Sequence, residues 1–278
     1  MNMRKILSNY TYLLSAILLI SGFMGALEFA LYSAIEHILW FRMMHHNQMA
    51  PDWLWFIVLV LISTLTLFWY RLLKAIVWTI RSTVVLNQKL TPQLQPLSMT
   101  LPPSLENIAT WYSIDNNDHF AFTWGWQRPR VAISKGLFQA LDPDAKRALL
   151  YHEAAHVQSH DFAQELVFEV LSKALPFLGI ELLYRRFQIR REIAADASSI
   201  AACGGNDLPL LSALLTTLRP SQAEPPCVGF EGTIDARIAF LQTGHIPTLW
   251  DSQIRSRLLT VLCFISALFG QGLLIWCH

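Results

Sequence analysis

The stretch from Leu149 to Asp161 reads LLYHEAAHVQSHD and carries His152 and His156 four residues apart, with Glu153 directly after the first histidine. An α-helix turns 100° per residue, so the two imidazoles lie about 40° apart on one face and one turn apart in height. Both can therefore reach a single metal ion. Glu153 is offset from this pair and lies beside the open coordination position, where it can take a proton from a bound water.

Apolar neighbours indicate that this helix is half-buried: Leu149 and Leu150 precede the polar group, and Ala154 and Ala155 lie within it. Burying two histidines and a carboxylate without a partner is costly, which favours a metal site. The alternative is a chance occurrence of the pattern on a surface helix. Asp142, followed by Pro143, predicts the start of the helix, which continues through Tyr151.

A third ligand has few candidates. A histidine six residues after His156 is excluded because that position is Phe162, and a glutamate about twenty residues after it is excluded by Pro176. The best candidate is Glu192, within RREIAAD (190–196). Asp196 lies four residues later on the same helix face and can accept the outer N–H of a ligand histidine. The alternative is a surface Arg–Glu pair.

Three apolar stretches predict membrane spans: Leu13–Ile35, Trp53–Tyr70 and Leu258–Trp276. Each has about 18–23 residues, enough to cross the hydrocarbon core as a helix. The first is interpreted as a retained anchor and not as a signal peptide. Hydrophobic residues make up 53% of the chain and charged residues only 15%, which argues against an ordinary soluble domain. The net charge of +1 gives no reason to expect a nucleic-acid partner.

Basic residues indicate the orientation in the membrane. They cluster at three places: Arg4 and Lys5; Arg71, Lys74, Arg81 and Lys89; and Arg255 and Arg257. The positive-inside rule puts all three clusters in the cytoplasm, and His278 on the far side. The lipid bilayer is thus an expected partner.

The expected domains are an anchor with two spans (1–89), a proline-rich linker (90–103), a mostly soluble domain (104–254) and a last span (255–278). Within the soluble domain, a short helix is predicted at Ser104–Tyr112, and a hairpin at Phe120–Thr123 and Arg130–Ser134. A further helix is predicted at Tyr184–Ala202, ended by two glycines.

From Phe120 to about Leu241 the chain resembles the integral-membrane gluzincin peptidases. The resemblance rests on AFTWGWQRPRVAISKGLFQAL, on HEAAH and the following ExxxD pattern, and on the closing DARIAFL. One branch of these enzymes holds the HtpX and CAAX prenyl proteases, and the other the signal-transducing peptidases of the beta-lactam sensor family. The resemblance implies one zinc per chain, bound by His152, His156 and Glu192, with Glu153 as the general base.

The chain departs from the HtpX pattern between its two motifs, where no two further spans fit. Glu192 must meet the same metal as His152, so a single crossing by the apolar stretch Phe162–Tyr184 is excluded. We expect an amphipathic helix or helix pair there, bent at Pro176. This compact spacing is closer to the sensor-transducer branch, but no penicillin-binding domain is expected after His278.

Other polar residues have weaker patterns. Arg237, in the closing motif, is a candidate for stabilising the oxyanion or the substrate, and a structural ion pair is the alternative. Tyr184 and His245 are alternative oxyanion donors. Glu28 lies within an apolar span and either pairs with Lys173 or sits near the interface.

Two other features lie near the motif. His160 has the wrong spacing for a ligand and is expected at the surface or behind the ligands. Trp124 and Trp126 either shape an edge to which an extended peptide adds as a strand, or anchor the chain at the interface.

The expected protein is a mainly α membrane protein, in which a helical zincin-like metallopeptidase domain with a small β-hairpin packs on about three transmembrane helices. The expected function is zinc-dependent endoproteolysis of membrane or membrane-proximal proteins at a bacterial inner membrane, with the peptidase domain in the cytoplasm. The alternative is a non-proteolytic signalling or scaffold protein with a structural zinc site. Glu153 argues against this alternative, because a structural site does not need it.

Overall fold

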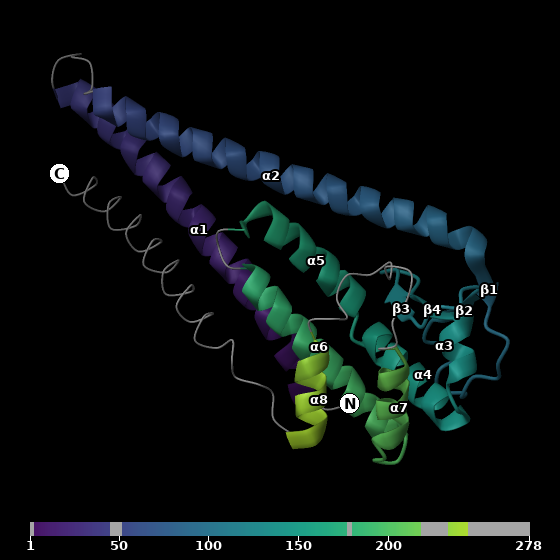
Figure 1. The fold of residues 1–278 in the computed structure, drawn as a ribbon. Coiled ribbons are helices and arrows are strands. Elements are labelled where there is room, and N and C mark those ends of the chain that lie inside the picture. Colours follow the sequence, from purple (N-terminus) through teal and green to yellow (C-terminus); the bar gives the residue numbers. More distant parts are fainter. Residues whose placement is uncertain (1–2, 45–51, 177–179, 218–232, 244–278) are drawn as a thin grey trace. The chain divides into compact units, whose positions relative to one another are not determined.

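The computed structural model describes residues 3–44, 52–176, 180–217 and 233–243, and these are mostly helical with one small sheet (Figure 1). The chain divides into two compact units, of which the first holds residues 79–167 and 185–248 and the second residues 10–78 and 168–184, with the chain ends shared between them. The elements in chain order are α1 (Met3–Met44), α2 (Asp52–Leu90), a 3-10 turn η1 (Thr91–Gln93), β1 (Leu94–Pro96), β2 (Thr110–Ile114), β3 (Ala121–Trp124), β4 (Arg130–Ser134), α3 (Lys135–Ala140), α4 (Pro143–Gln158), α5 (Asp161–Ala174), α6 (Ile180–Ala202), α7 (Leu208–Thr217) and α8 (Ile234–Thr243).

Long helices make up the second unit. The predicted spans Leu13–Ile35 and Trp53–Tyr70 fall inside α1 and α2, whereas Leu258–Trp276 lies outside the described residues. Among the described residues, one helical stretch, Trp55–Gln93, is long and apolar enough to cross a membrane. Many of its apolar side chains are exposed, as lipid-facing side chains would be. The three-span arrangement stays a prediction.

The stretch Phe162–Tyr184 forms the predicted helix pair. Helix α5 ends at Ala174 and α6 begins at Ile180, on either side of Pro176. Near the break, Phe168 and Tyr184 stack in the second unit, with ring centroids 5.6 Å apart. The chain thus turns back on itself, as the shared-metal argument requires, and whether this pair meets a membrane stays a prediction.

The sheet has four strands in the order β1-β2-β4-β3. The predicted hairpin is confirmed, since β3 and β4 pair antiparallel from Ala121↔Ile133 to Trp124↔Arg130. Strand β1 comes from the segment predicted as a linker and pairs with β2, which itself runs parallel to β4. In this order β3 is an edge strand.

The helix predicted at Ser104–Tyr112 is wrong, because residues 110–114 form β2. Its sequence, TWYSI, is rich in aromatic and β-branched residues, which favour a strand. Trp111 is buried in the core and its indole N–H donates to the Leu105 carbonyl at 3.1 Å. The burial of this side chain therefore adds to the local preference for a strand.

The predicted start of the motif helix is confirmed. Asp142 is the N-cap of α4, and its Oδ1 accepts a hydrogen bond from the Ala145 amide at 2.8 Å. One side of α4 contributes Leu149, Leu150 and Ala154 to the main core cluster, which also contains Val131 and Ile133 of β4, together with Ala213 of α7. Because α4 packs against both the sheet and α7, its other face is held in a fixed direction.

Candidate metal centre

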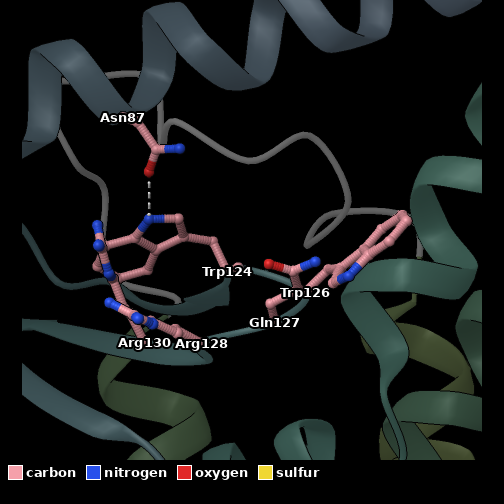
Figure 2. Close-up of a pocket in the computed structure, with 7 residues that line it drawn as sticks. Asn87, Trp124, Trp126, Gln127, Arg128 and Arg130 are labelled. Atoms are coloured by element: carbon pink, nitrogen blue, oxygen red, sulfur yellow. Dashed lines mark hydrogen bonds between the residues drawn. The ribbon is translucent and has the colours of Figure 1, made fainter.

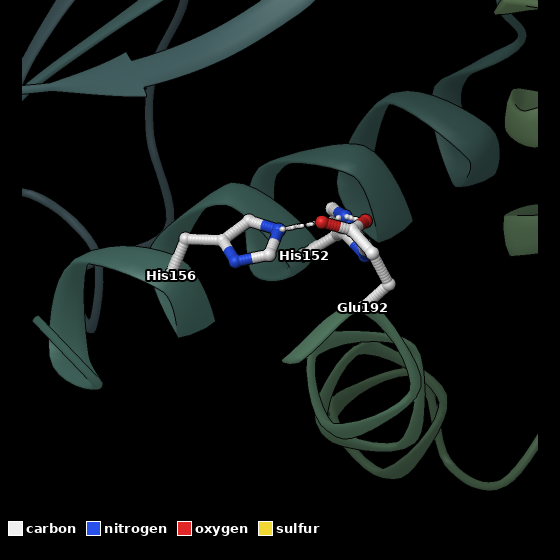
Figure 3. A group of neighbouring side chains, drawn as sticks. All are labelled: His152, His156 and Glu192. Carbon is white, nitrogen blue, oxygen red and sulfur yellow. Dashed lines mark hydrogen bonds and ion pairs between the residues drawn. The ribbon is translucent and has the colours of Figure 1, made fainter. Parts of the chain in front are cut away.

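Three buried side chains from two helices converge: His152 and His156 from α4, and Glu192 from α6 (Figure 3). The two Nε2 atoms lie 3.1 Å apart. Glu192 places Oε2 3.5 Å from His152 Nε2 and Oε1 3.7 Å from His156 Nε2. The predicted ligand set is thus brought together around one point.

The predicted face of α6 is directed at α4. Glu192, Asp196 and Ser199 follow one another at intervals of four and three residues, so they share one side of the helix. All three are buried, and Ser199 Oγ donates to the Ala148 carbonyl of α4 at 2.7 Å. This bond pins the two helices together and fixes the height of Glu192 relative to the histidines.

Carboxylates also engage the outer nitrogens of both histidines. His152 Nδ1 lies 3.0 Å from Asp196 Oδ1, and His156 Nδ1 lies 2.7 Å from Asp161 Oδ2. A carboxylate beside Nδ1 favours the tautomer with its proton on Nδ1, which makes Nε2 the nitrogen available to a metal ion. Asp196 lies where the sequence predicts it, whereas Asp161 was not anticipated.

The backbone explains how Asp161 reaches His156. Helix α4 ends at Gln158, and His160 adopts a left-handed conformation with φ of 53°. This turn redirects the chain into α5, whose first residue is Asp161. An acidic residue just past the end of the motif helix is the sequence signal, but helical spacing alone does not place it behind His156.

Two arginines flank the Glu192 carboxylate. Arg237 of α8 makes a forked contact with Asp196, through Nε at 2.8 Å and Nη2 at 2.6 Å, and its Nη1 lies 3.2 Å from Glu192 Oε2. Arg191 places Nη2 3.3 Å from Glu192 Oε1 and Nη1 2.9 Å from Glu165 Oε2. Since Glu192 is only 7% exposed, the alternative of a surface Arg–Glu pair is wrong.

These charges control protonation in the cluster. Burial alone would lower the pKa of His152, but the side-chain contacts with Asp196 and Glu192 raise this pKa to about 9. For the Glu192 carboxyl, burial alone would raise the pKa. The two histidines and both arginines instead hold this pKa well below its usual range. Glu192 is therefore an ionised carboxylate, the form that binds a cation.

Glu153 lies next to the cluster and is also buried. Its Oε2 accepts a hydrogen bond from Thr123 Oγ1 of β3 at 2.9 Å. This bond fixes the carboxylate between the motif helix and the edge strand, and it leaves Oε1 for another partner.

The cluster fits a divalent metal ion. Two imidazole nitrogens bound to zinc at about 2.0–2.1 Å in a tetrahedral arrangement would lie about 3.3 Å apart, close to the 3.1 Å found here. Glu192 Oε2 is buried and forms no hydrogen bond among the described residues, and its ion-pair contact with Arg237 Nη1 at 3.2 Å leaves a lone pair for a metal ion. Two histidines and one carboxylate are a ligand set of zinc sites that keep one position for water.

The remaining predicted residues have varied surroundings. The Trp124 side chain is buried in the core, whereas Trp126 is exposed. Tyr184 belongs to the second unit, and His245 lies outside the described residues. Lys173 pairs with Glu169 at 2.7 Å and not with Glu28.

We expect Asp161→Asn to weaken zinc binding about 10- to 100-fold, because the amide cannot hold the proton on His156 Nδ1 as a carboxylate does. Competition with a chromophoric chelator measures this affinity. Asp118→Asn, an exchange of the same kind in a loop outside the cluster, is the matched control. Equal affinity in the wild type and Asp161→Asn would show that the contact has no role in metal binding.

Comparison with known proteins supports this assignment of the cluster. No curated protein matches the chain. Residues 86–223, which include both motif helices and the whole sheet, match the model of Peptidase family M48. This similarity supports a metallopeptidase of the zincin type, which would act on protein or peptide substrates.

Proposed function

We propose that this protein is a zinc-dependent endopeptidase that cleaves membrane or membrane-proximal proteins. The observation that carries the proposal is the convergence of His152, His156 and Glu192 on one point, with Glu153 beside them, inside the segment similar to metallopeptidases. Zinc is bound by these three side chains, one ion per chain.

Bound zinc supplies a Lewis acid that polarises the carbonyl of the scissile peptide bond. Glu153 Oε1 takes a proton from the attacking water as the new C–O bond forms, while the Thr123 hydroxyl holds Oε2 in place. When the C–N bond breaks, Glu153 passes this proton to the leaving amine. The products are a carboxyl and an amine, and Glu153 returns to its ionised form.

Arg237 has a positioning role in this proposal. Its guanidinium is buried, forked onto Asp196 and close to Glu192. These contacts favour the structural ion pair over oxyanion stabilisation, because its donors already face carboxylates. Asp196 in turn keeps His152 oriented.

The alternative, a scaffold protein with a structural zinc site, has less support. Structural zinc sites have four protein ligands, whereas three side chains converge among the described residues. A structural site also gives no reason to bury Glu153 next to the ligands.

The experiment that tests the proposed function is digestion of denatured casein by the full chain in detergent. We expect cleavage that 1,10-phenanthroline abolishes and that added zinc restores, because the chelator removes the ion that polarises the carbonyl. Cleavage that persists at the untreated rate after the metal has been removed would contradict the proposal.

We further propose that the protein is a multi-pass protein of a bacterial inner membrane with the metal centre in the cytoplasm. The apolar helix Trp55–Gln93 and the distribution of basic residues support this placement. Reporter fusions at Gln88, Gln188 and His278 should indicate cytoplasm, cytoplasm and exterior. Opposite sides for Gln88 and Gln188 would refute the shared-side topology.

A further inference from the structure

A second pocket opens at the turn between β3 and β4, outside the ligand cluster (Figure 2). Arg128 and Arg130 lie at one end of it and Trp126 at the other. Trp126 is 66% exposed, so its ring is accessible to a ligand. The pocket thus has an exposed aromatic ring at one end and two positive charges at the other.

The charge of this pocket is unbalanced. Its lining contains two arginines and no acidic residue. In the described part of the chain, neither Arg128 nor Arg130 forms an ion pair with a carboxylate, unlike Arg191 and Arg237. Guanidinium groups bind carboxylates and phosphates in forked geometry, so the pocket is suited to an anion.

The turn that carries the pocket is held in a defined shape. The Trp124 indole N–H donates to Asn87 Oδ1 of α2 at 2.8 Å, and Trp124 pairs with Arg130 across the hairpin. Gly125 has φ of 92°, and a Cβ atom there would lie 2.6 Å from the Arg128 carbonyl oxygen. A preformed site loses less entropy on binding a ligand than a flexible loop does.

The pocket is a neighbour of the metal centre. A narrow crevice beside His156 and Asp161 is lined by Thr123 and, like the arginine pocket, by Gly125 and Trp126. The two hollows therefore share Gly125 and Trp126 as walls. One borders the metal ligand His156, and the other contains the arginines.

We propose that Arg128 and Arg130 bind a carboxylate of the peptide substrate, from either an Asp or Glu side chain or a free C-terminus. A peptide extended along the edge strand β3 from Thr123, beside Glu153, advances about 3.3 Å per residue. It reaches the arginine pocket about two to four residues from the cleaved bond. This inference rests on the proposed peptidase function and adds a substrate class to it.

The test begins with the cleavage sites of the full-length, zinc-loaded protein in a peptide mixture from a denatured proteome, mapped by mass spectrometry. We expect Asp and Glu, or the peptide C-terminus, to be enriched at one fixed distance from the cleaved bond. Paired synthetic peptides then separate the two sources, with Glu against Gln at that position and a free against an amidated C-terminus. The preferred member should have a kcat/KM roughly five- to tenfold higher, as expected for one charged contact.

Variants assign this preference to the pocket. In Arg128→Ala/Arg130→Ala the ratio of the paired kcat/KM values should fall to about one, whereas Arg128→Lys/Arg130→Lys should retain part of it. Lys135→Ala, a cation outside the pocket, should leave the ratio at the wild-type value. A ratio that stays unchanged in the double alanine variant would overturn the inference.

Other outcomes are equally decisive. Cleavage without any carboxylate preference would refute this inference alone, whereas absence of all zinc-dependent cleavage would refute the proposed function and the inference with it. Short-chain phosphatidylglycerol tests the phosphate of a lipid headgroup as the anion. Arginine-dependent binding of this lipid, with equal cleavage of the paired peptides, would assign the pocket to a membrane surface and overturn the proposal.

Discussion

Replacing Glu153 with Gln should reduce kcat/KM for peptide cleavage about 10²- to 10⁴-fold while leaving the zinc content at the wild-type level. The amide retains the size of the side chain and can still contact Thr123, but it cannot accept the proton of the attacking water. Glu153 is adjacent to the ligands without being one of them, so the metal stays bound. Casein digestion and metal analysis on the same preparation measure both properties.

Glu106→Gln is the matched control, because Glu106 is an exposed glutamate in the same unit. This control should cleave casein at the wild-type rate. A Glu153→Gln protein that also cleaves at that rate would show that another group moves the proton, although the metal centre could still stand.

Replacing Arg237 with Ala should destabilise the first unit by about 3–5 kcal/mol. The change leaves Asp196 and Glu192 buried without the guanidinium that contacts both. For a protein of this size, such a loss lowers the thermal midpoint by roughly 10 °C. Unfolding followed by intrinsic tryptophan fluorescence, in protein first stripped of metal, measures the effect without a contribution from the ligand.

Arg237→Lys should recover only part of this stability, because an ammonium group cannot make the forked contact with Asp196. Arg81→Ala removes an exposed arginine and should leave the midpoint unchanged. An Arg237→Ala midpoint within about 2 °C of the wild type would show that the buried network does not stabilise the unit.

Local patterns in the sequence were sufficient to predict the motif helix. The cap at Asp142 and the four-residue spacing of His152 and His156 depend only on neighbours along the chain. Glu192 and Asp196 could be predicted in the same way, because they lie four residues apart and therefore on one face of a helix. Their approach to α4 follows from the requirement that one metal be shared.

Features set by non-local packing could not be predicted. The helix expected around Tyr112 is a strand because Trp111 is buried against the core. Strand β1 has three residues, and its pairing with β2 joins Leu94 to Ile114 across a long loop. Asp161 reaches His156 through a left-handed residue at a helix break, a conformation that no periodic pattern predicts.

The burial of Trp124 illustrates the same limit. Two tryptophans flank Gly125, and strict alternation would place residues 124 and 126 on the same side of the hairpin. The left-handed Gly125, with φ of 92°, breaks this alternation, so that Trp124 is buried and Trp126 is exposed. Which side faces the core depends on Asn87, which accepts the Trp124 indole hydrogen bond from far along the chain. The exposed Trp126 is therefore the residue of this pair that is available to a substrate.

Metal analysis of the purified full chain tests the central claim most directly. We predict about one zinc per chain in the wild type and in Glu169→Ala, whose side chain pairs with Lys173. His152→Ala, His156→Ala and Glu192→Ala should lose the zinc, because each removes one of three ligands. Wild-type zinc content in both histidine variants would contradict the assignment of the metal centre.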